Sequence, residues 1–267
     1  MIDFDKQFEA FLRERIEKNE DISEESIKEF ENQLPTFYEQ FINTPNNSID
    51  GLTPKAYMQK FTSANELINE FIISNEDDSS PCALLLDRIT EVRECASELF
   101  KIIETSSNTK MVMCAINLLQ EMNEPHPVVL YAKWLIDGNK DRDLIDIIAD
   151  VLMEHANEVK EILLSSINKV ELWQKEIIAD ILVCAGKDDR TFELLNELFI
   201  TSRNLPFTAG LFGKYGDERA VAVLYPKLDE CVDAYDFIEV RNAIEQLGGV
   251  VDETAYPIMD KFLDENN

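Results

Sequence analysis

The chain has 267 residues, 45% of them hydrophobic, and is long enough to bury a core as one large domain or two small ones. Its 53 acidic and 25 basic residues give a formal net charge of −28, which repels phosphates and anionic headgroups, so we expect neither a nucleic acid nor a membrane as partner. Five scattered cysteines argue against a disulfide framework, and the first residues lack a secretion signal, so we expect a cytoplasmic protein.

The composition favours an all-α fold. Helix formers such as Leu, Glu, Lys and Ala outweigh strand formers, and only 8 Gly and 9 Pro interrupt the chain. No apolar run approaches the roughly 18 residues of a membrane-spanning helix. The acidic excess has two interpretations: it keeps a cytosolic protein in solution, or it forms a surface that attracts a basic partner.

The first helix expected from the sequence covers residues 4–16, where apolar residues recur at steps of three and four and line one face. A second helix is expected to begin at Ser23, whose hydroxyl suits an N-terminal cap, and to run toward Phe41. Pro35 lies inside this second run. It is expected to kink or break the helix, because proline removes a backbone hydrogen bond.

Two shorter helices complete the N-terminal part. Thr53 and Pro54 supply a cap and a preset first helical residue, and another helix is expected from Ser63. The acidic stretch 75–81, which contains two serines and ends in a proline, then interrupts the helical pattern. We therefore expect residues 1–78 to form an N-terminal helical cap region and residues 81–267 to form a repeat array packed on it.

Beyond this boundary the helices are expected in close succession, separated by short turns. The expected helices are 81–89, 91–104, 108–122, 127–137, 141–155, 157–167, 170–185, 190–201, 205–215, 217–230, 234–247 and 253–265. Short connections make neighbouring helices pack antiparallel, and a helix with one apolar stripe buries it on the next pair. The sequence thus predicts a stack of helical hairpins.

Two kinds of internal sequence repeat support this prediction. The turns 138–142, 186–190 and 216–219 each begin with a glycine, which can end a helix in the left-handed conformation, and each contains an aspartate that can cap the next helix. In addition, the pair Tyr225-Pro226 returns thirty-one residues later as Tyr256-Pro257. Such intervals indicate a repeat protein.

The last third of the chain carries a pattern that identifies the repeat type. It consists of a leucine helix ending in glycine, an aspartate turn, a helix of the form Arg-Ala-Val-x-x-Leu, and Val-Arg in the next helix. The residues that carry it are Leu211, Gly216, Asp217, Arg219, Ala220, Val221, Leu224, Leu228, Val240, Arg241, Ala243, Leu247 and Gly248. This pattern resembles repeats of the HEAT type, in particular the short bacterial HEAT-like repeats named after phycobilisome lyases.

The HEAT resemblance covers about residues 81–265, and it extends to earlier segments. Val92-Arg93 opens a similar helix, and 179–186 is similar to the end of one. The resemblance implies a right-handed α-α superhelix, a HEAT-like solenoid with an N-terminal helical cap. Arg93 and Arg241 are expected to pair with aspartates in neighbouring turns.

We find no catalytic, cofactor-binding or metal-binding pattern in the sequence, and we expect no cofactor. His126 and His155 have no Cys or His at ligand spacing. The segment 137–148 resembles the opening of a calcium loop, but it has Arg142 where the loop requires Gly and Ile148 where it requires Glu. A turn between two helices explains this segment better.

Large aromatic residues near the repeat turns are candidate contacts for a protein partner. Most such residues are core residues by their usual burial. Trp173 follows Glu171 at a helix start and is the residue that best suits an anchor on the concave face. We name Trp134, Trp173 and Tyr215 as the candidate partner-binding residues.

We therefore expect a non-enzymatic scaffold or adaptor that binds a protein partner on the concave face of an acidic solenoid. The negative charge allows this partner to be basic. Two alternatives stay open. One is an enzyme, since the HEAT-like resemblance includes bilin lyases and DNA glycosylases, although a glycosylase needs a basic groove. The other is an acidic mimic of DNA that inhibits a nucleic-acid-binding protein, which requires the negative residues to gather on one face.

Overall fold

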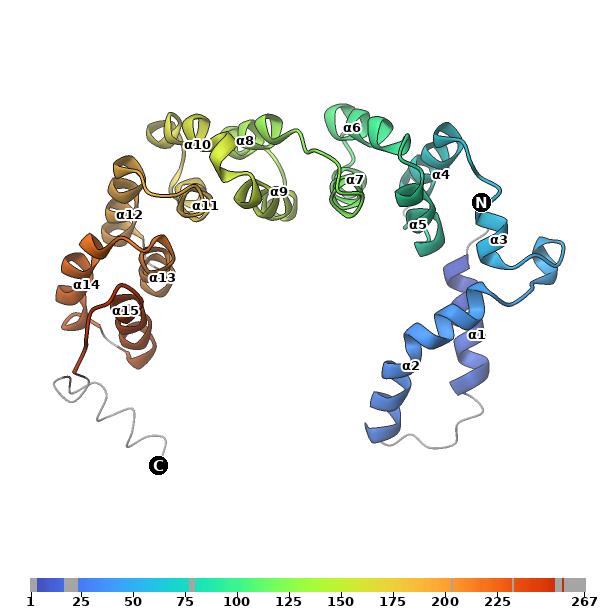
Figure 1. The fold of residues 1–267 in the computed structure, drawn as a ribbon, viewed down its shortest axis with the longest axis horizontal. Coiled ribbons are helices and arrows are strands. Elements are labelled where there is room, and N and C mark those ends of the chain that lie inside the picture. The colour runs from blue at the N-terminus through green and yellow to red at the C-terminus, as the bar shows by residue number, and fades with distance from the viewer. Residues whose placement is uncertain are drawn as a thin grey trace. The chain divides into compact units, whose positions relative to one another are not determined.

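The structure is a computed structural model that describes residues 4–16, 24–76, 80–202, 204–231, 233–252 and 256 (Figure 1). Within these residues the protein is all-α, with fifteen α-helices, three short 3-10 helices and no β-strand. None of the described helices is long and apolar enough to cross a membrane.

The helices pack mostly against their neighbours in the sequence and divide into two units, Met1–His126 and Pro127–Asn267. Unit 1 contains α1 (Phe4–Ile16), α2 (Glu24–Ile42), η1 (Asn47–Ile49), α3 (Pro54–Met58), α4 (Ala64–Glu76), α5 (Ala83–Glu91), α6 (Cys95–Thr105) and α7 (Thr109–Glu121). Unit 2 contains α8 (Val128–Asp137), α9 (Arg142–Glu154), α10 (Ala156–Leu164), η2 (Ile167–Lys169), α11 (Leu172–Val183), α12 (Asp189–Thr201), α13 (Leu205–Tyr215), η3 (Glu218–Ala220), α14 (Val221–Leu228) and α15 (Ala234–Gln246).

The helices predicted beyond residue 81 are confirmed as far as the structure describes them. Helices α5 to α15 match eleven of the twelve expected, with ends that differ by at most four residues. The expected helix 253–265 lies outside the described residues, as do Ser23 and Pro257. In unit 1, α4 packs on α5, α6 and α7. The predicted division into residues 1–78 and 81–267 stays a prediction.

The sequence predicts a kink or a break at Pro35, and the break does not occur. Helix α2 continues through Pro35 to Ile42. Aromatic residues that follow the proline pack on α1, with the ring centroid of Phe8 lying 5.2 Å from that of Tyr38 and 5.4 Å from that of Phe41. We conclude that this packing outweighs the one backbone hydrogen bond that the proline removes.

The predicted caps are confirmed at three helix ends. The hydroxyl of Thr53 accepts a hydrogen bond from the amide of Ala56 at 3.1 Å, and Pro54 is the first residue of α3. Gly138 and Gly216 end α8 and α13 with φ angles of 63° and 71°. These left-handed conformations suit glycine, so the turns after α8 and α13 begin where the sequence predicts. Helix α11 instead ends at Val183, before Gly186.

Helices α9, α11, α13 and α15 of unit 2 pack side by side in a row, and Figure 1 shows α8, α10, α12 and α14 along the other side of this row. Leu152 of α9 and Leu182 of α11 are completely buried. At Gly213 of α13, an added Cβ atom would lie 3.2 Å from Cδ of Gln246 on α15, so glycine leaves room for this side chain. Among the polar residues of this row, Gln174 of α11 and Thr208 of α13 are buried.

Candidate functional site

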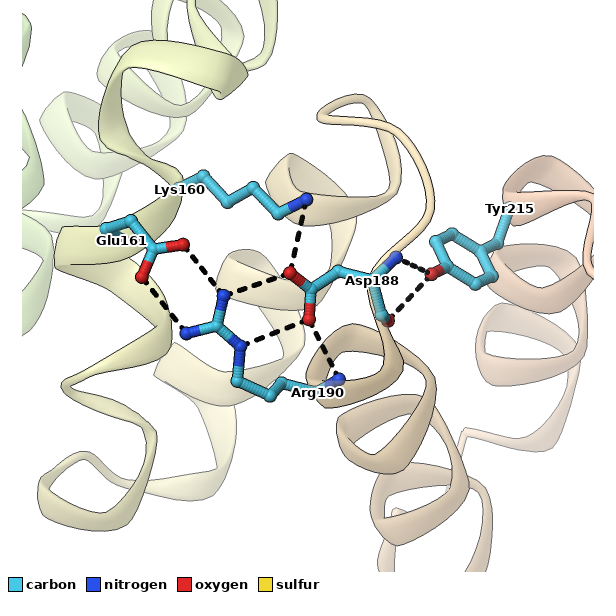
Figure 2. A network of polar contacts seen from close by, with 5 residues as sticks. All are labelled: Lys160, Glu161, Asp188, Arg190 and Tyr215. Atoms are coloured by element: carbon cyan, nitrogen blue, oxygen red, sulfur yellow. Dashed lines mark hydrogen bonds and ion pairs between the residues drawn. The ribbon is translucent and has the colours of Figure 1, made fainter.

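Arg190 connects two successive helical pairs of unit 2 through its guanidinium group (Figure 2). Its Nη1 and Nη2 donate to the two carboxylate oxygens of Glu161 on α10 at 3.0 and 2.7 Å. Its Nε donates to Oδ1 of Asp188 at 3.1 Å, and Nη2 also donates to Oδ2 at 2.9 Å. A planar guanidinium bound to two carboxylates in this way fixes orientation as well as distance.

Asp188 and Tyr215 complete the network that Figure 2 shows. Oδ1 of Asp188 accepts from the backbone amide of Arg190 at 2.9 Å and caps α12, while Nζ of Lys160 lies 3.4 Å from Oδ2. The Tyr215 hydroxyl accepts from the amide of Asp188 at 2.6 Å and donates to the carbonyl of the same residue at 2.8 Å. The end of α13 therefore holds the turn between α11 and α12 in place.

The charges in this network are matched. Hydrogen bonds from Arg190 hold the pKa of the Asp188 carboxyl well below its ordinary value, and they lower the pKa of Glu161 as well. Both carboxylates stay ionised at neutral pH and accept hydrogen bonds from within the chain. The arrangement therefore binds one part of the protein to another and holds no proton for acid–base chemistry.

The same arrangement recurs around Arg219. Nη2 of Arg219 lies 2.7 Å from Oδ2 of Asp217 in its own turn, and Nη1 lies 2.9 Å from Oδ1 of Asp189. Arg190 reaches back 29 residues along the chain, and Arg219 reaches back thirty. We call the two copies the turn network, whose residues are Lys160, Glu161, Asp188, Asp189, Arg190, Tyr215, Asp217 and Arg219.

The two arginines that we predicted to pair with aspartates in neighbouring turns, Arg93 and Arg241, have different outcomes. Arg93 binds a neighbouring turn, but through Glu124 rather than an aspartate, with Nε 2.8 Å from Oε1. Arg241 donates to Oδ1 of the adjacent Asn242 at 2.9 Å, and its pairing with an aspartate stays a prediction. An Asp two residues before an Arg, the spacing in both copies of the turn network, is the signal that the sequence analysis did not use.

The three candidate partner-binding residues lie at two places in unit 2. Trp134 and Trp173 are half-buried beside the turn between α8 and α9, with Nζ of Lys140 4.6 Å from one ring centroid and Cζ of Arg142 5.0 Å from the other. Tyr215 is 5% exposed, and its hydroxyl is used in the turn network. That these residues contact a partner stays a prediction.

Gln174 joins the start of α11 to the end of α8. The side chain is buried, and Nε2 donates to the carbonyls of Leu135 and Ile136 at 2.7 and 2.8 Å. Its Oε1 accepts from the amide of Glu171 at 2.8 Å. One amide group thus caps two helix ends and places the preceding residue, Trp173, against the turn between α8 and α9.

A hollow of about 320 Å³ opens between α9, α11 and α13, and we call it the groove. Its lining combines carboxylates with apolar side chains: Arg142, Asp146, Ala149, Asp150, Met153, Glu176, Ile177, Asp180, Asn204 and Phe207. Apolar surface beside carboxylates suits the side chains of lysine and arginine, which carry a charge at the end of an aliphatic stem.

The carboxylates of the groove are only partly paired. Oδ1 of Asp146 lies 3.4 Å from Nε of Arg142, and Oδ1 of Asp180 lies 2.6 Å from Nζ of Lys214. Within the described ranges of the chain, Asp150 has no ion pair. Four carboxylates and a single arginine line the groove, which leaves it negatively charged.

The segment that resembled a calcium loop is a turn between two helices, as predicted. Helix α8 ends at Asp137 and α9 begins at Arg142. Elsewhere too, in the part of the chain that the structure describes, no three His, Cys, Asp or Glu side chains gather closely enough to hold a metal ion.

Comparison of the chain with protein-family models, with curated proteins and with solved structures found no match. The fold therefore defines an all-helical protein and does not identify its family. The candidate site comprises the turn network, whose charges are matched, and the groove, whose carboxylates are only partly paired.

Proposed function

We propose that this protein is a non-enzymatic scaffold or adaptor, and that unit 2 binds a basic segment of a protein partner in the groove. One observation carries the proposal: the groove joins apolar surface to an excess of carboxylates, among which Asp150 has no ion pair within the described residues. A cationic side chain of the partner rests its stem on Ile177 and Met153 and brings its charge to Asp150.

We further propose that the helices form a right-handed α-solenoid of the HEAT-like type, with the groove on its concave face. The proposal is supported by the packing of helices on their sequence neighbours and by the row of α9, α11, α13 and α15. It is also supported by the turn network, whose contacts repeat at 29 and thirty residues. Solenoids use the surface formed by successive repeats to bind other proteins.

The net charge is consistent with a cationic partner. At −28, the field of the chain accelerates the approach of a basic protein segment, and this effect weakens as salt screens it. The same field opposes binding to phosphate groups. We therefore propose a basic protein segment, and not a nucleic acid, as the ligand of the groove.

The test measures the affinity of a fluorescein-labelled peptide, in which lysine and arginine alternate with leucine, by fluorescence anisotropy. Asp150→Lys places a cation in the groove and is expected to weaken binding about tenfold or more, because like charges then face each other. Glu193→Lys makes the same change of charge at an exposed position of α12 outside the groove. It is expected to weaken binding less than about twofold.

Two results would contradict the proposal. The first is an equal loss of affinity in the two variants, which would mean that the peptide senses only the total charge. The second is the absence of peptide binding to the unmodified protein at physiological salt.

A further inference from the structure

One arginine of the chain already lies at the edge of the groove. Nε of Arg142 is 3.4 Å from Oδ1 of Asp146, and Cζ is 5.0 Å from the ring centroid of Trp173. The guanidinium thus uses its edge for a carboxylate and its face for an aromatic ring. A planar, weakly hydrated guanidinium can do both at once, whereas a compact, strongly hydrated ammonium has no flat face to stack.

A second guanidinium in unit 2 is held in the same manner. Cζ of Arg219 lies 4.3 Å from the ring centroid of Phe192, while Nη2 pairs with Asp217 at 2.7 Å. Lys140 differs: its Nζ lies over the ring of Trp134, and within the described residues it pairs with no carboxylate. Two arginines of unit 2, Arg142 and Arg219, are therefore held by a ring and a carboxylate together.

The lining of the groove itself offers a further carboxylate and an aromatic ring. Asp150 lies one helical turn beyond Asp146 on α9, and Phe207 of α13 is a half-buried lining residue. Among the residues that the structure describes, Asp150 forms no ion pair and no cation lies over the ring of Phe207. Ile177 of α11 lines the same hollow and adds apolar surface.

We infer that the groove recognises an arginine side chain of the partner in preference to lysine, with its guanidinium stacked on Phe207 and paired with Asp150. The inference rests on the proposed function, since it specifies which cation the groove accepts. The aliphatic stem of the arginine lies along Ile177, and the charge complements the carboxylates that line the groove.

The experiment compares two fluorescein-labelled peptides that differ only at their cationic positions, which are all arginine in one and all lysine in the other. Affinities are measured by fluorescence anisotropy at physiological salt. The unmodified protein is expected to bind the arginine peptide about tenfold more tightly, since stacking of a partly desolvated guanidinium adds to the charge pairing. Phe207→Leu keeps an apolar side chain but removes the ring, and it is expected to abolish this preference.

A second variant guards against a folding defect in Phe207→Leu. Asp150 is exposed, so Asp150→Asn leaves the core unchanged. It is expected to weaken binding of the arginine peptide more than binding of the lysine peptide, because only arginine also uses the neighbouring ring. Glu193→Gln neutralises a carboxylate outside the groove and serves as the matched control; it is expected to leave the ratio of the two affinities unchanged.

The outcomes separate this inference from the proposed function. Equal affinities of the two peptides for the unmodified protein overturn the arginine preference and leave docking in the groove intact. Failure of both peptides to bind overturns the proposed function and this inference with it. An arginine preference that both Phe207→Leu and Asp150→Asn leave unchanged means that another surface recognises arginine, which also overturns the inference.

Discussion

Two carboxylate-rich regions of unit 2 differ in how their charges are paired. In the turn network, Glu161 and Asp188 face Arg190, and Asp189 and Asp217 face Arg219. In the groove, four carboxylates surround a single lining arginine. The net charge of −28 therefore includes carboxylates in two different environments, paired in the turn network and partly unpaired in the groove. One set of carboxylates joins helical pairs, and we propose that the other set binds a partner.

The largest effect on stability is expected at Tyr215, whose hydroxyl joins α13 to the backbone of Asp188. Tyr215→Phe removes a buried hydroxyl that bonds the amide and the carbonyl of Asp188, and we expect the free energy of unfolding to fall by about 1–3 kcal/mol. The measurement is equilibrium unfolding in urea. The control is Tyr235→Phe, whose side chain is 65% exposed and whose effect is expected to stay within about 0.5 kcal/mol. Equal effects of the two substitutions would show that the hydrogen bonds of the Tyr215 hydroxyl add nothing to stability.

A matched pair of aspartates compares the two regions directly. Asp188→Ala removes a helix cap and both arginine contacts, and we expect it to lower the free energy of unfolding by about 1–2 kcal/mol. Asp150→Ala makes the same truncation in the groove and is expected to change stability by less than about 0.5 kcal/mol. Urea unfolding of the two variants gives the difference. A larger loss of stability in Asp150→Ala would reverse the roles that we assign.

Acid is expected to weaken the turn network selectively. Hydrogen bonds from Arg190 lower the pKa of Asp188 and of Glu161. The two ionised carboxylates therefore contribute their full stabilisation at pH values above the ordinary carboxyl pKa of about 4. It is lost as the pH falls through their lowered pKa values. Arg190→Gln removes the cause of the shift, so stability should fall less steeply below about pH 4 in this variant.

The comparison of these two acid profiles is internally controlled. Burial raises the pKa of Asp87 and of Asp236, and their protonation favours the folded state as the pH decreases. Both residues are present in both proteins, so this opposing contribution cancels in the difference. Parallel profiles for the unmodified protein and Arg190→Gln would contradict the role of the arginine.

The smallest effect is expected for the lysine of the turn network. Nζ of Lys160 lies 3.4 Å from Asp188, which is a single contact, whereas Arg190 donates several hydrogen bonds to the same carboxylate. Lys160→Met keeps the aliphatic stem and is expected to lower the free energy of unfolding by about 0.5 kcal/mol or less. A loss as large as that of Asp188→Ala would mean that Lys160 holds the turn.

The helices of this fold could be predicted from the sequence because their signals are local. Apolar residues recur at helical spacing, and Thr53, Gly138 and Gly216 mark helix ends by their own chemistry. A kink or a break was expected at Pro35, and the break does not occur, because aromatic residues of α2 pack on α1, a separate segment of the chain. Tertiary contacts decided what a local rule left open.

The candidate site could not be predicted, because it depends on the register between helices. Arg190 meets Glu161 only because α10 and α12 both pack on α11 in a particular register. A carboxylate 29 residues away carries no local sign of that partner. Asp150 is one of 53 acidic residues, and it shares one hollow with Phe207 only because α9 and α13 both pack against α11.

The most direct test of the division between the two regions measures stability and peptide affinity in the same two variants, Asp188→Ala and Asp150→Ala. Our account predicts that Asp188→Ala lowers the free energy of unfolding while the folded variant binds the arginine peptide as the unmodified protein does. Asp150→Ala should unfold like the unmodified protein and bind the peptide about tenfold more weakly. Two variants that lose peptide affinity equally, with Asp150→Ala also losing stability, would contradict the account.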